Sequence, residues 1–465
     1  MEQSTIAEIE AFFVKASGMV WSEPLLILLL GGGAFFMVYS RFLPFKYFRH
    51  AVNVLRGKYD DPNDPGQISH FEALSGAIAA TVGMGNISGV ALAIVAGGPG
   101  AIFWMWISAG FGMATKFFTC TLAVMYRGKD KNGQVQGGPM YVIREGLGKK
   151  WISLAIFFSI AGMLGATPVF QANQMVAAFK DVALAGVSLP ENTFWLDLSI
   201  GLVIAALVAL VILGGIERIG SVASKMVPAM VVVYVLSVLV ILFIHYDQVL
   251  PSLALIIEDA FTAKAALGGA IGAIIIEGGK RAAFSNEAGI GTAPMMHGAA
   301  KTDEPVREGL VAMLGPAIDT LVICTMTGLC IIITGAWKTD GNDGILVTAN
   351  AFGESLPGIG PYILTTCVMV FAITTIFGLA YYATKCFSFL VGPKIGYYFN
   401  YWYVILVIIG SVATLDIVVN FVFVAYGLMS IPTMVSALVL APKVLAEAKS
   451  YFRRLESGEI RKFDQ

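Results

Sequence analysis

Long apolar runs recur along nearly the whole chain. A helix that crosses a bilayer needs about 20 mainly apolar residues. Charged residues make up 13% of the 465 residues, about half the fraction usual in a soluble protein. The sequence therefore predicts an all-α polytopic membrane protein with 11 transmembrane helices, at 24–43, 71–97, 100–126, 151–179, 194–215, 221–245, 264–295, 308–336, 360–391, 401–420 and 422–443.

Basic residues collect in alternate loops, and this pattern sets the orientation. They follow the first, third and last predicted spans, whereas the intervening loops carry mainly acidic residues. Cytoplasmic loops are the ones enriched in Lys and Arg. We therefore expect a multi-pass protein of the cell membrane with its N-terminus outside and its C-terminus cytoplasmic. The tail 444–465 alternates basic and apolar residues, which predicts either an amphipathic helix on the inner surface or a solvated tail.

Two of the predicted spans are interrupted. The second contains TVGMGN (Thr81–Asn86), and the seventh contains IIIEGGKRAAFSNEAGIG (Ile274–Gly291). In the seventh span, Gly278–Gly279 and Phe284–Asn286 are both candidate break points. Gly-interrupted segments at matching places in two halves indicate the binding site of a transporter.

The spacing of the two interruptions predicts an inverted repeat. Five spans separate their starts, and because five is odd, the two copies must have opposite topology. The domains are then an N-terminal segment with one extra helix (1–70), two five-helix repeats (71–262 and 263–443) and the tail (444–465).

An interrupted helix offers ligands to an anion and to a cation. Gly83 and Gly85 release the helix and let a ligand approach the main chain. The half-helix that begins there presents N–H groups to a carboxylate, and the half-helix that ends there presents carbonyl oxygens to a small cation. An amino acid with Na⁺ as coupling ion fits this pair. The alternative is a glycine-rich face for close helix packing.

Other function classes fit the sequence less well. A channel needs rings of repeated carbonyls or charges, and an enzyme needs a nucleophile with a base or a metal cluster; neither pattern is evident. A nucleotide-binding interpretation of the glycines needs a preceding strand. The net charge of −1 argues against a nucleic-acid partner. The five cysteines lie in apolar runs and are expected to be buried. The oligomeric state stays open, and a monomer is compatible with the sequence.

Four segments resemble the alanine or glycine:cation symporter family. They are LSGAIAATVGMGNISGVALAIVAGGPGAIFWMW (Leu74–Trp106), QGGPMYVIREGLG (Gln136–Gly148), AFSNEAGIGTAP (Ala283–Pro294) and REGLVAMLGPAIDTLVICTMTGL (Arg307–Leu329). The V-G-x-G-N core is also similar to the neurotransmitter:sodium symporters. The resemblance implies the inverted-repeat fold of amino-acid transporters and import of a small neutral amino acid, alanine or glycine, driven by Na⁺. A proton-coupled symporter, or one for larger neutral amino acids such as glutamine, is the alternative.

The resemblance also assigns roles to individual residues. It places the substrate carboxylate at the amides of Met84 and Gly85, with Gly83 giving room. Thr81 and Asn86 would hold a second Na⁺ or the substrate ammonium. Other expected substrate contacts are Gln171, Asn286 and, as a wall, Phe284. The implied sodium ligands are the carbonyls of Ala79 and Val82 with the hydroxyls of Thr374 and Thr375.

Two departures from the family pattern affect the pocket. Leu379 stands where the family usually has Trp, so the pocket is expected to admit more than alanine or glycine. Thr384 stands where Glu is common.

Several charges and histidines lie in or near the spans. Glu277 is spaced for a helical pair with Lys280 or Arg281. Asp319 lies deep in its span, and proton coupling through it is a hypothesis. Further charged residues are expected either to have a functional role or to lie near span ends and extend their charge to the membrane surface: Lys116, Glu287, Lys385 and Asp416. The four histidines, His50, His70, His245 and His297, are expected to be interfacial.

Overall fold

The computed structural model describes residues 2–61, 63–130, 133–183, 192–261, 270–339 and 344–460. These residues form helices and one antiparallel hairpin of two short strands, β1 (Gly128–Lys129) and β2 (Val135–Gln136). The first helices are α1 (Glu2–Val20), α2 (Glu23–Leu26), α3 (Gly32–Tyr39), α4 (Leu43–Lys46), α5 (Phe48–Leu55), α6 (His70–Thr81), α7 (Val90–Gly97), α8 (Ala101–Met125), α9 (Pro139–Tyr141), α10 (Ile152–Gly165), α11 (Val169–Ala183), α12 (Phe194–Ile212), α13 (Gly215–Ile244) and α14 (Tyr246–Asp259). They are followed by α16 (Ala270–Asn286), α17 (Ala293–His297), α18 (Pro305–Ala312), α19 (Leu314–Pro316), α20 (Thr325–Thr334), α21 (Ile345–Ser355), α22 (Gly360–Val391), α23 (Pro393–Gly396), α24 (Phe399–Val412) and α25 (Leu415–Glu456). Short π-helical turns are η1 (Ile27–Gly31), η2 (Gly85–Gly89), η3 (Val142–Leu147) and η5 (Ala317–Cys324), and 3₁₀ turns are η4 (Lys149–Trp151) and η6 (Ala336–Lys338).

The helices long and apolar enough to cross a membrane match most of the predicted spans. The described residues contain 8 such helices, or up to 10 if each of two bent helix pairs counts as one span. One bent pair is α6 with η2 and α7, at the predicted break in the second span. The seventh predicted span contains α16, but its first residues and the boundary between the two predicted repeats fall within 262–269, outside the described residues. Eleven spans and the inverted repeat stay predictions.

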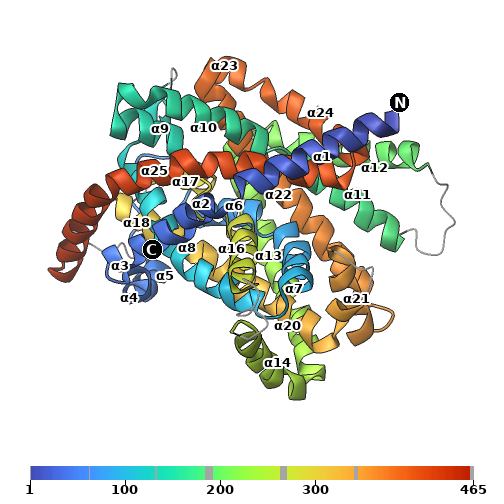
Figure 1. Ribbon diagram of the computed structural model, residues 1–465. Helices are drawn as coiled ribbons and strands as arrows, with labels where there is room; N and C mark the ends of the chain where they lie inside the picture. The colour runs from blue at the N-terminus through green and yellow to red at the C-terminus, as the bar shows by residue number, and fades with distance from the viewer. Residues whose placement is uncertain are drawn as a thin grey trace.

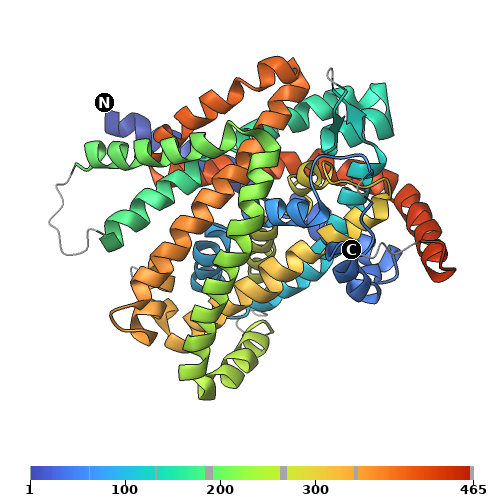
Figure 2. The same ribbon diagram turned by 180° about the vertical axis from the view of Figure 1, so that it is seen from behind.

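The interrupted helices lie at the centre of the molecule. In Figure 1, α6, α16 and α8 meet in the middle, and Figure 2 shows the long helices α13 and α22 crossing on the opposite side. Glycines allow this close packing: a Cβ at Gly278 would lie 2.8 Å from the carbonyl oxygen of Ala101, and one at Gly378 would lie 3.1 Å from Cα of Ala80.

The second interruption lies at the later of the two candidate break points. Helix α16 is continuous through Gly278–Gly279 and ends at Asn286, the last residue of the candidate Phe284–Asn286. The chain leaves the helix at Glu287, which has a positive φ of 53°, and turns through Gly289 and Gly291 before α17 begins. Gly278 and Gly279 serve packing instead, because they adjoin Trp104 and Leu30. The candidate at Gly278–Gly279 was therefore wrong, whereas the candidate at Phe284–Asn286 coincides with the last turn of α16, directly before the break.

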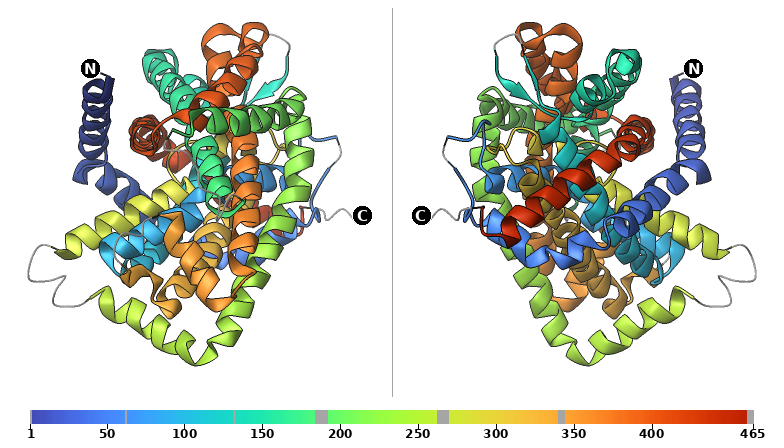
Figure 3. Two further views of the ribbon diagram at one scale, coloured as in Figure 1. Left: turned by 90° about the vertical axis from the view of Figure 1, so that its right-hand side faces the viewer. Right: turned by 90° about the vertical axis from the view of Figure 1, so that its left-hand side faces the viewer.

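The last helix joins the final predicted span to the tail. Helix α25 runs without a gap to Glu456 and contains Pro432 and Pro442. Helix α1 packs along its first part, and Figure 1 shows its last part turned away. Figure 3 shows α14 folding back from the end of α13 at one edge of the molecule. Residues 461–465 of the predicted tail lie outside the described residues.

Candidate functional site

The first interruption is held open by a side chain from within it. Helix α6 ends at Thr81, Val82 takes an extended conformation (φ −73°, ψ 100°), and the chain bends by 56° before α7. Asn86 Oδ1 accepts a hydrogen bond from the Gly83 N–H at 2.9 Å. The amide side chain thus replaces the helical partner that Gly83 has lost, and it leaves the Asn86 Nδ2 group to donate elsewhere.

That Nδ2 group leads to a buried carboxylate, Asp319. It donates to Asp319 Oδ1 at 2.7 Å, and Ser285 Oγ and Thr320 Oγ1 donate to Asp319 Oδ2 at 2.7 and 2.8 Å. All four side chains are buried, and Asp319 is 0% exposed. The three donors are uncharged, so no ion pair neutralises this carboxylate among the residues that the structure describes. Asp319 therefore joins the first interruption, through the Asn86 amide, to α16 and η5. Its carboxylate and the two hydroxyls supply oxygen atoms that suit a hard cation.

The sodium ligands implied by the resemblance are partly assembled. Thr375 Oγ1 lies 3.0 Å from the carbonyl oxygen of Ala79. A Cβ at Gly83 would lie 2.6 Å from the same hydroxyl, so glycine is required there. Val82 lies at the end of α6 beside them. The hydroxyl of Thr374 lies elsewhere, because it donates within α22 and contacts Met230 Sδ.

A cavity of about 200 Å³, here named the Met84 cavity, opens beside the interruption. It is several times larger than the ~30 Å³ that one water occupies. Among its lining residues are Met84, Phe170, Gln174 and Phe284. Phe284 packs against Phe423 and Phe170, with ring centroids 4.7 and 6.1 Å apart. A Cβ at Gly85 would lie 3.3 Å from Cα of Ser285, so α16 touches the interruption directly.

Of the nine predicted substrate residues, only Met84 and Phe284 line this cavity. Thr81 donates back to the carbonyl of Ile78 at 3.3 Å. The Asn286 side chain joins Thr320 Oγ1 and the Ala288 N–H, at 3.1 and 3.0 Å. Leu379 is 1% exposed in the core, and Gln171 is buried with its Oε1 lacking a hydrogen-bond partner among the described residues.

The second interruption has its own buried carboxylate, Glu287. It accepts hydrogen bonds from Thr292 Oγ1 and, at 2.7 Å, from the Tyr426 hydroxyl. Lys116 of α8 lies within electrostatic reach of both Glu287 and Asp319. Through these contacts Glu287 binds Thr292, later in the same unwound segment, and Tyr426 of α25. The carboxylate therefore fastens the segment to α25.

The far ends of the two interrupted helices meet at a third buried carboxylate, Glu308 of α18. Glu308 Oε2 contacts Nδ1 of His70, the first residue of α6, and its Oε1 lies 2.5 Å from Nδ1 of His297, the last residue of α17. His70 and His297 are 1% and 0% exposed. Their position at the membrane interface stays a prediction, but each imidazole is buried against the same carboxylate, a partner that sequence analysis did not identify.

Arg127 reinforces this end of the molecule. Its guanidinium donates to the carbonyl oxygens of Gly298, Ala300 and Thr302 just after α17. Burial lowers the pKa of Arg127 to about 10, which leaves the group charged at neutral pH. The arginine therefore holds the segment that follows the second interruption.

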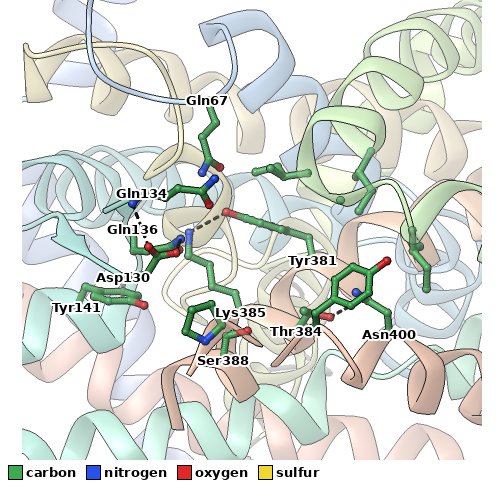
Figure 4. A pocket seen from close by; sticks show the side chains of 16 residues that line it. Gln67, Asp130, Gln134, Gln136, Tyr141, Tyr381, Thr384, Lys385, Ser388 and Asn400 are labelled. Carbon is green, nitrogen blue, oxygen red and sulfur yellow. Dashed lines mark hydrogen bonds between the residues drawn. The ribbon is translucent and has the colours of Figure 1, made fainter. Parts of the chain in front are cut away.

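A second cavity, of about 190 Å³, lies near this end and is here named the Lys385 cavity. Figure 4 shows Lys385 pointing to the Tyr381 hydroxyl, 2.7 Å away, with Gln134, Gln136 and Asp130 on the opposite wall. The Lys385 ammonium also donates to the carbonyl of Met295, at 3.2 Å. Lys385 is 5% exposed, and its hydrogen bonds connect α22 to α17. Thr384 in the same wall donates to Asn400 Oδ1 at 2.8 Å.

Two smaller predictions are confirmed. Arg281 Nε lies 2.5 Å from Glu277 Oε1, as a pair four residues apart on a helix allows. All five cysteines are free and buried. Sequence reasoning missed Ser285, Thr320, Gln174 and Glu308 as possible site residues; only their polar character within apolar runs distinguished them.

Comparison with known proteins identifies the family. The model of the sodium:alanine symporter family matches residues 6–465. The chain is 40% identical over 450 residues to the sodium/alanine symporter AgcS of Methanococcus maripaludis, covering 96% of each chain. It is 34% identical over 449 residues to the probable sodium/glutamine symporter GlnT of Bacillus subtilis, covering 96% of this chain and 91% of that one.

The fold is similar to that of a solved structure. MhsT in complex with L-phenylalanine matches with a TM-score of 0.61 at 14% sequence identity, over 83% of this chain and 93% of that one. At this identity the similarity shows a shared fold alone. Because the family model spans nearly the whole chain, this protein belongs to the sodium:alanine symporter family, which is a family of transporters and not of enzymes.

Proposed function

We propose that this protein imports a small neutral amino acid, alanine or glycine, driven by the Na⁺ gradient, with alternating access to a site at the two interrupted helices. The observation that carries the proposal is the cluster around Asp319. A fully buried carboxylate with only neutral donors around it is costly to keep. Such a cost is expected where a cation enters and leaves.

The contacts support two cation positions. The first uses the Ala79 and Val82 carbonyls with the Thr375 hydroxyl. The second uses the Asp319 carboxylate with the hydroxyl oxygens of Ser285 and Thr320. Both consist of hard oxygen ligands, which alkali cations require.

The amino acid would lie between them, at the beginning of η2. The N–H groups of Met84 and Gly85 open the half-helix formed by η2 and α7, and the first N–H groups of a helix lack partners within it. They suit a carboxylate. The Met84 cavity then gives access from one side and the Lys385 cavity from the other. We place the N-terminus outside and the C-terminus in the cytoplasm, as the loop charges predict.

A larger substrate such as glutamine is the second candidate. It is supported by the relative named as a probable sodium/glutamine symporter and by Leu379, where the family usually has Trp. Proton coupling through Asp319 is the alternative for the driving ion.

Uptake into proteoliposomes tests the proposal. Purified protein should accumulate labelled alanine or glycine only with an inward Na⁺ gradient, and unlabelled glutamine should be compared as competitor. A proton gradient, Li⁺ and K⁺ serve as matched ion controls. Uptake that is indifferent to Na⁺, H⁺ and Li⁺ would overturn ion coupling, and uptake driven by H⁺ alone would replace Na⁺ as the coupling ion.

A further inference from the structure

A wide groove lies between the end of α3, the helix α4 and the last turns of α25. Its volume is about 890 Å³. Tyr47 and Phe452 lie face to face in its wall, with ring centroids 3.6 Å apart and planes 10° apart, and so join the two parts of the chain. The groove lies far along the chain from both interruptions, and none of its lining residues belongs to the Met84 or Lys385 cavity. They are Val38, Tyr39, Ser40, Arg41, Leu43, Lys46, Tyr47, Leu445, Ala448, Lys449, Phe452, Arg453 and Glu456.

The groove carries an excess of positive charge. Four basic residues, Arg41, Lys46, Lys449 and Arg453, line it with one acidic residue, Glu456, so the lining has a net charge of +3 (4 minus 1). None of the four forms a salt bridge within the described part of the chain.

The neighbouring Arg454 behaves differently. Its guanidinium donates to both oxygens of Glu304, at 2.6 and 2.8 Å. Arg454, which does not line the groove, therefore has an acidic partner in Glu304. The four basic residues that line the groove have no such partner in the described chain and can bind another anion. Charge complementarity therefore calls for an anionic ligand.

Apolar side chains adjoin the bases. Beside the groove, Phe42 and Phe45 are 55% and 56% exposed, and Val38 in its wall is 65% exposed. In a protein with so many membrane-crossing helices, exposed apolar side chains at a helix end meet acyl chains. The ligand must therefore combine an anionic group with a long apolar part.

The backbone at the rim is held in an unfavourable conformation. Arg41 and Phe42 have φ of 55° and 57°, and they are two of the three non-glycine residues with positive φ in the described chain. Non-glycine residues in this conformation are strained, and they gather where function constrains the chain. This turn ends α3 and places a base in the groove next to an exposed phenylalanine.

We propose that this groove binds an anionic phospholipid, with its phosphate among Arg41, Lys46, Lys449 and Arg453 and its acyl chains along Val38, Phe42 and Phe45. Basic pockets at the ends of transmembrane helices are suited to such headgroups. The lipid would lie in the leaflet predicted to be cytoplasmic. It would hold the end of α25 against α3 and α4.

Lipid titration of the purified full-length protein tests this site. In neutral detergent, phosphatidylglycerol should raise the melting temperature in a saturable way, because a ligand that binds only the folded state stabilises it. Phosphatidylcholine at the same concentration should not. Native mass spectrometry should show one retained phosphatidylglycerol per chain.

Variants locate the binding. Replacing Arg41, Lys449 and Arg453 with Gln should weaken the affinity about fivefold for each charge removed. Glu456→Gln should strengthen it by a similar factor. The matched control replaces three exposed bases away from the groove, Lys150, Arg218 and Lys394, and should leave the affinity unchanged.

Several results would overturn the proposal. The first is that phosphatidylcholine raises the melting temperature as much as phosphatidylglycerol does. The second is that the triple groove variant keeps the wild-type affinity for phosphatidylglycerol. The third is that inorganic phosphate stabilises the protein equally, which would indicate a site for free anions. If the triple variant does not fold, the Arg41→Gln and Glu456→Gln variants carry the test, because they must shift the affinity in opposite directions.

Discussion

Two buried carboxylates join the interrupted helices, and their surroundings differ. Asp319 and Glu308 are both 0% exposed. Asp319 meets Asn86 of the first interruption and Ser285 at the end of α16. Glu308 meets His70 and His297 at the far ends of the same two segments.

The difference lies in the donors. Asp319 accepts hydrogen bonds only from an amide and two hydroxyls, which stabilise its charge without neutralising it. Glu308 lies between two imidazoles, which can carry protons and form ion pairs with it. Asp319 accepts hydrogen bonds from neutral groups only and forms no salt bridge in the described chain, although Lys116 lies within electrostatic reach; such a charge suits a cation that comes and goes. Glu308 is held on both oxygens by imidazoles, which suits a permanent link. We therefore propose that Asp319 takes part in coupling and that Glu308 fixes the far ends of the two interrupted helices.

Asp319→Asn should have the largest effect on transport. The substitution keeps the shape and removes the charge that would hold the cation, so Na⁺-driven uptake should fall at least on the order of a hundredfold. Uptake and Na⁺-dependent thermal stabilisation are the measurements. Glu277→Gln, which removes a carboxylate paired with Arg281, is the matched control and should retain uptake. Wild-type Na⁺ dependence in Asp319→Asn, together with an unchanged pH profile, would remove Asp319 from coupling by either ion.

Glu308→Gln should act on stability more than on ion affinity. Removing one partner of a buried ionic cluster costs about 3 kcal/mol or more, so the melting temperature in detergent should fall by several degrees. The Na⁺ concentration for half-maximal stabilisation should change little, because the substitution does not touch the Asp319 cluster. A large shift in Na⁺ affinity at unchanged stability would contradict the division of roles.

The first interruption could be predicted from the sequence, because its cause is local. Gly83 and Gly85 within an apolar run weaken a helix wherever it lies, and Gly83 also leaves room for the Thr375 hydroxyl. The second interruption could not be located in this way. Gly278 and Gly279 give the same local signal, yet they remain helical because they allow close contact with Trp104 and Leu30.

The carboxylate clusters depend on the tertiary fold. Asn86 and Asp319 are 233 residues apart in the chain, and His70 and Glu308 are 238 apart. Helical or strand periodicity cannot relate residues so far apart in the chain. Asp319 could be identified because it lies deep within a predicted span, but its hydrogen-bond partners could not be predicted. For the same reason the common partner of His70 and His297 could not be predicted, since this carboxylate lies on a third segment.

Thr375→Val should raise the Na⁺ concentration for half-maximal uptake about tenfold, because one oxygen ligand to a charged group is lost. The neighbouring Thr374→Val is the matched control. Its hydroxyl contacts its own helix and Met230, so the shift should be at most about twofold. Substrate selectivity should be unchanged in both. Equal shifts in the two variants would show that the hydroxyl turned toward α6 has no special role.

The smallest expected effect separates two glutamines of α11. Gln174 lines the Met84 cavity, whereas Gln171 does not. Gln174→Leu should raise the alanine concentration for half-maximal uptake by about two- to fivefold, since a neutral hydrogen bond contributes about 1 kcal/mol. Gln171→Leu should leave that concentration near the wild-type value, because its Oε1 makes no hydrogen bond within the described chain. The opposite ranking would restore Gln171 as the substrate contact that the family resemblance implies, and it would mean that α11 rotates when the amino acid binds.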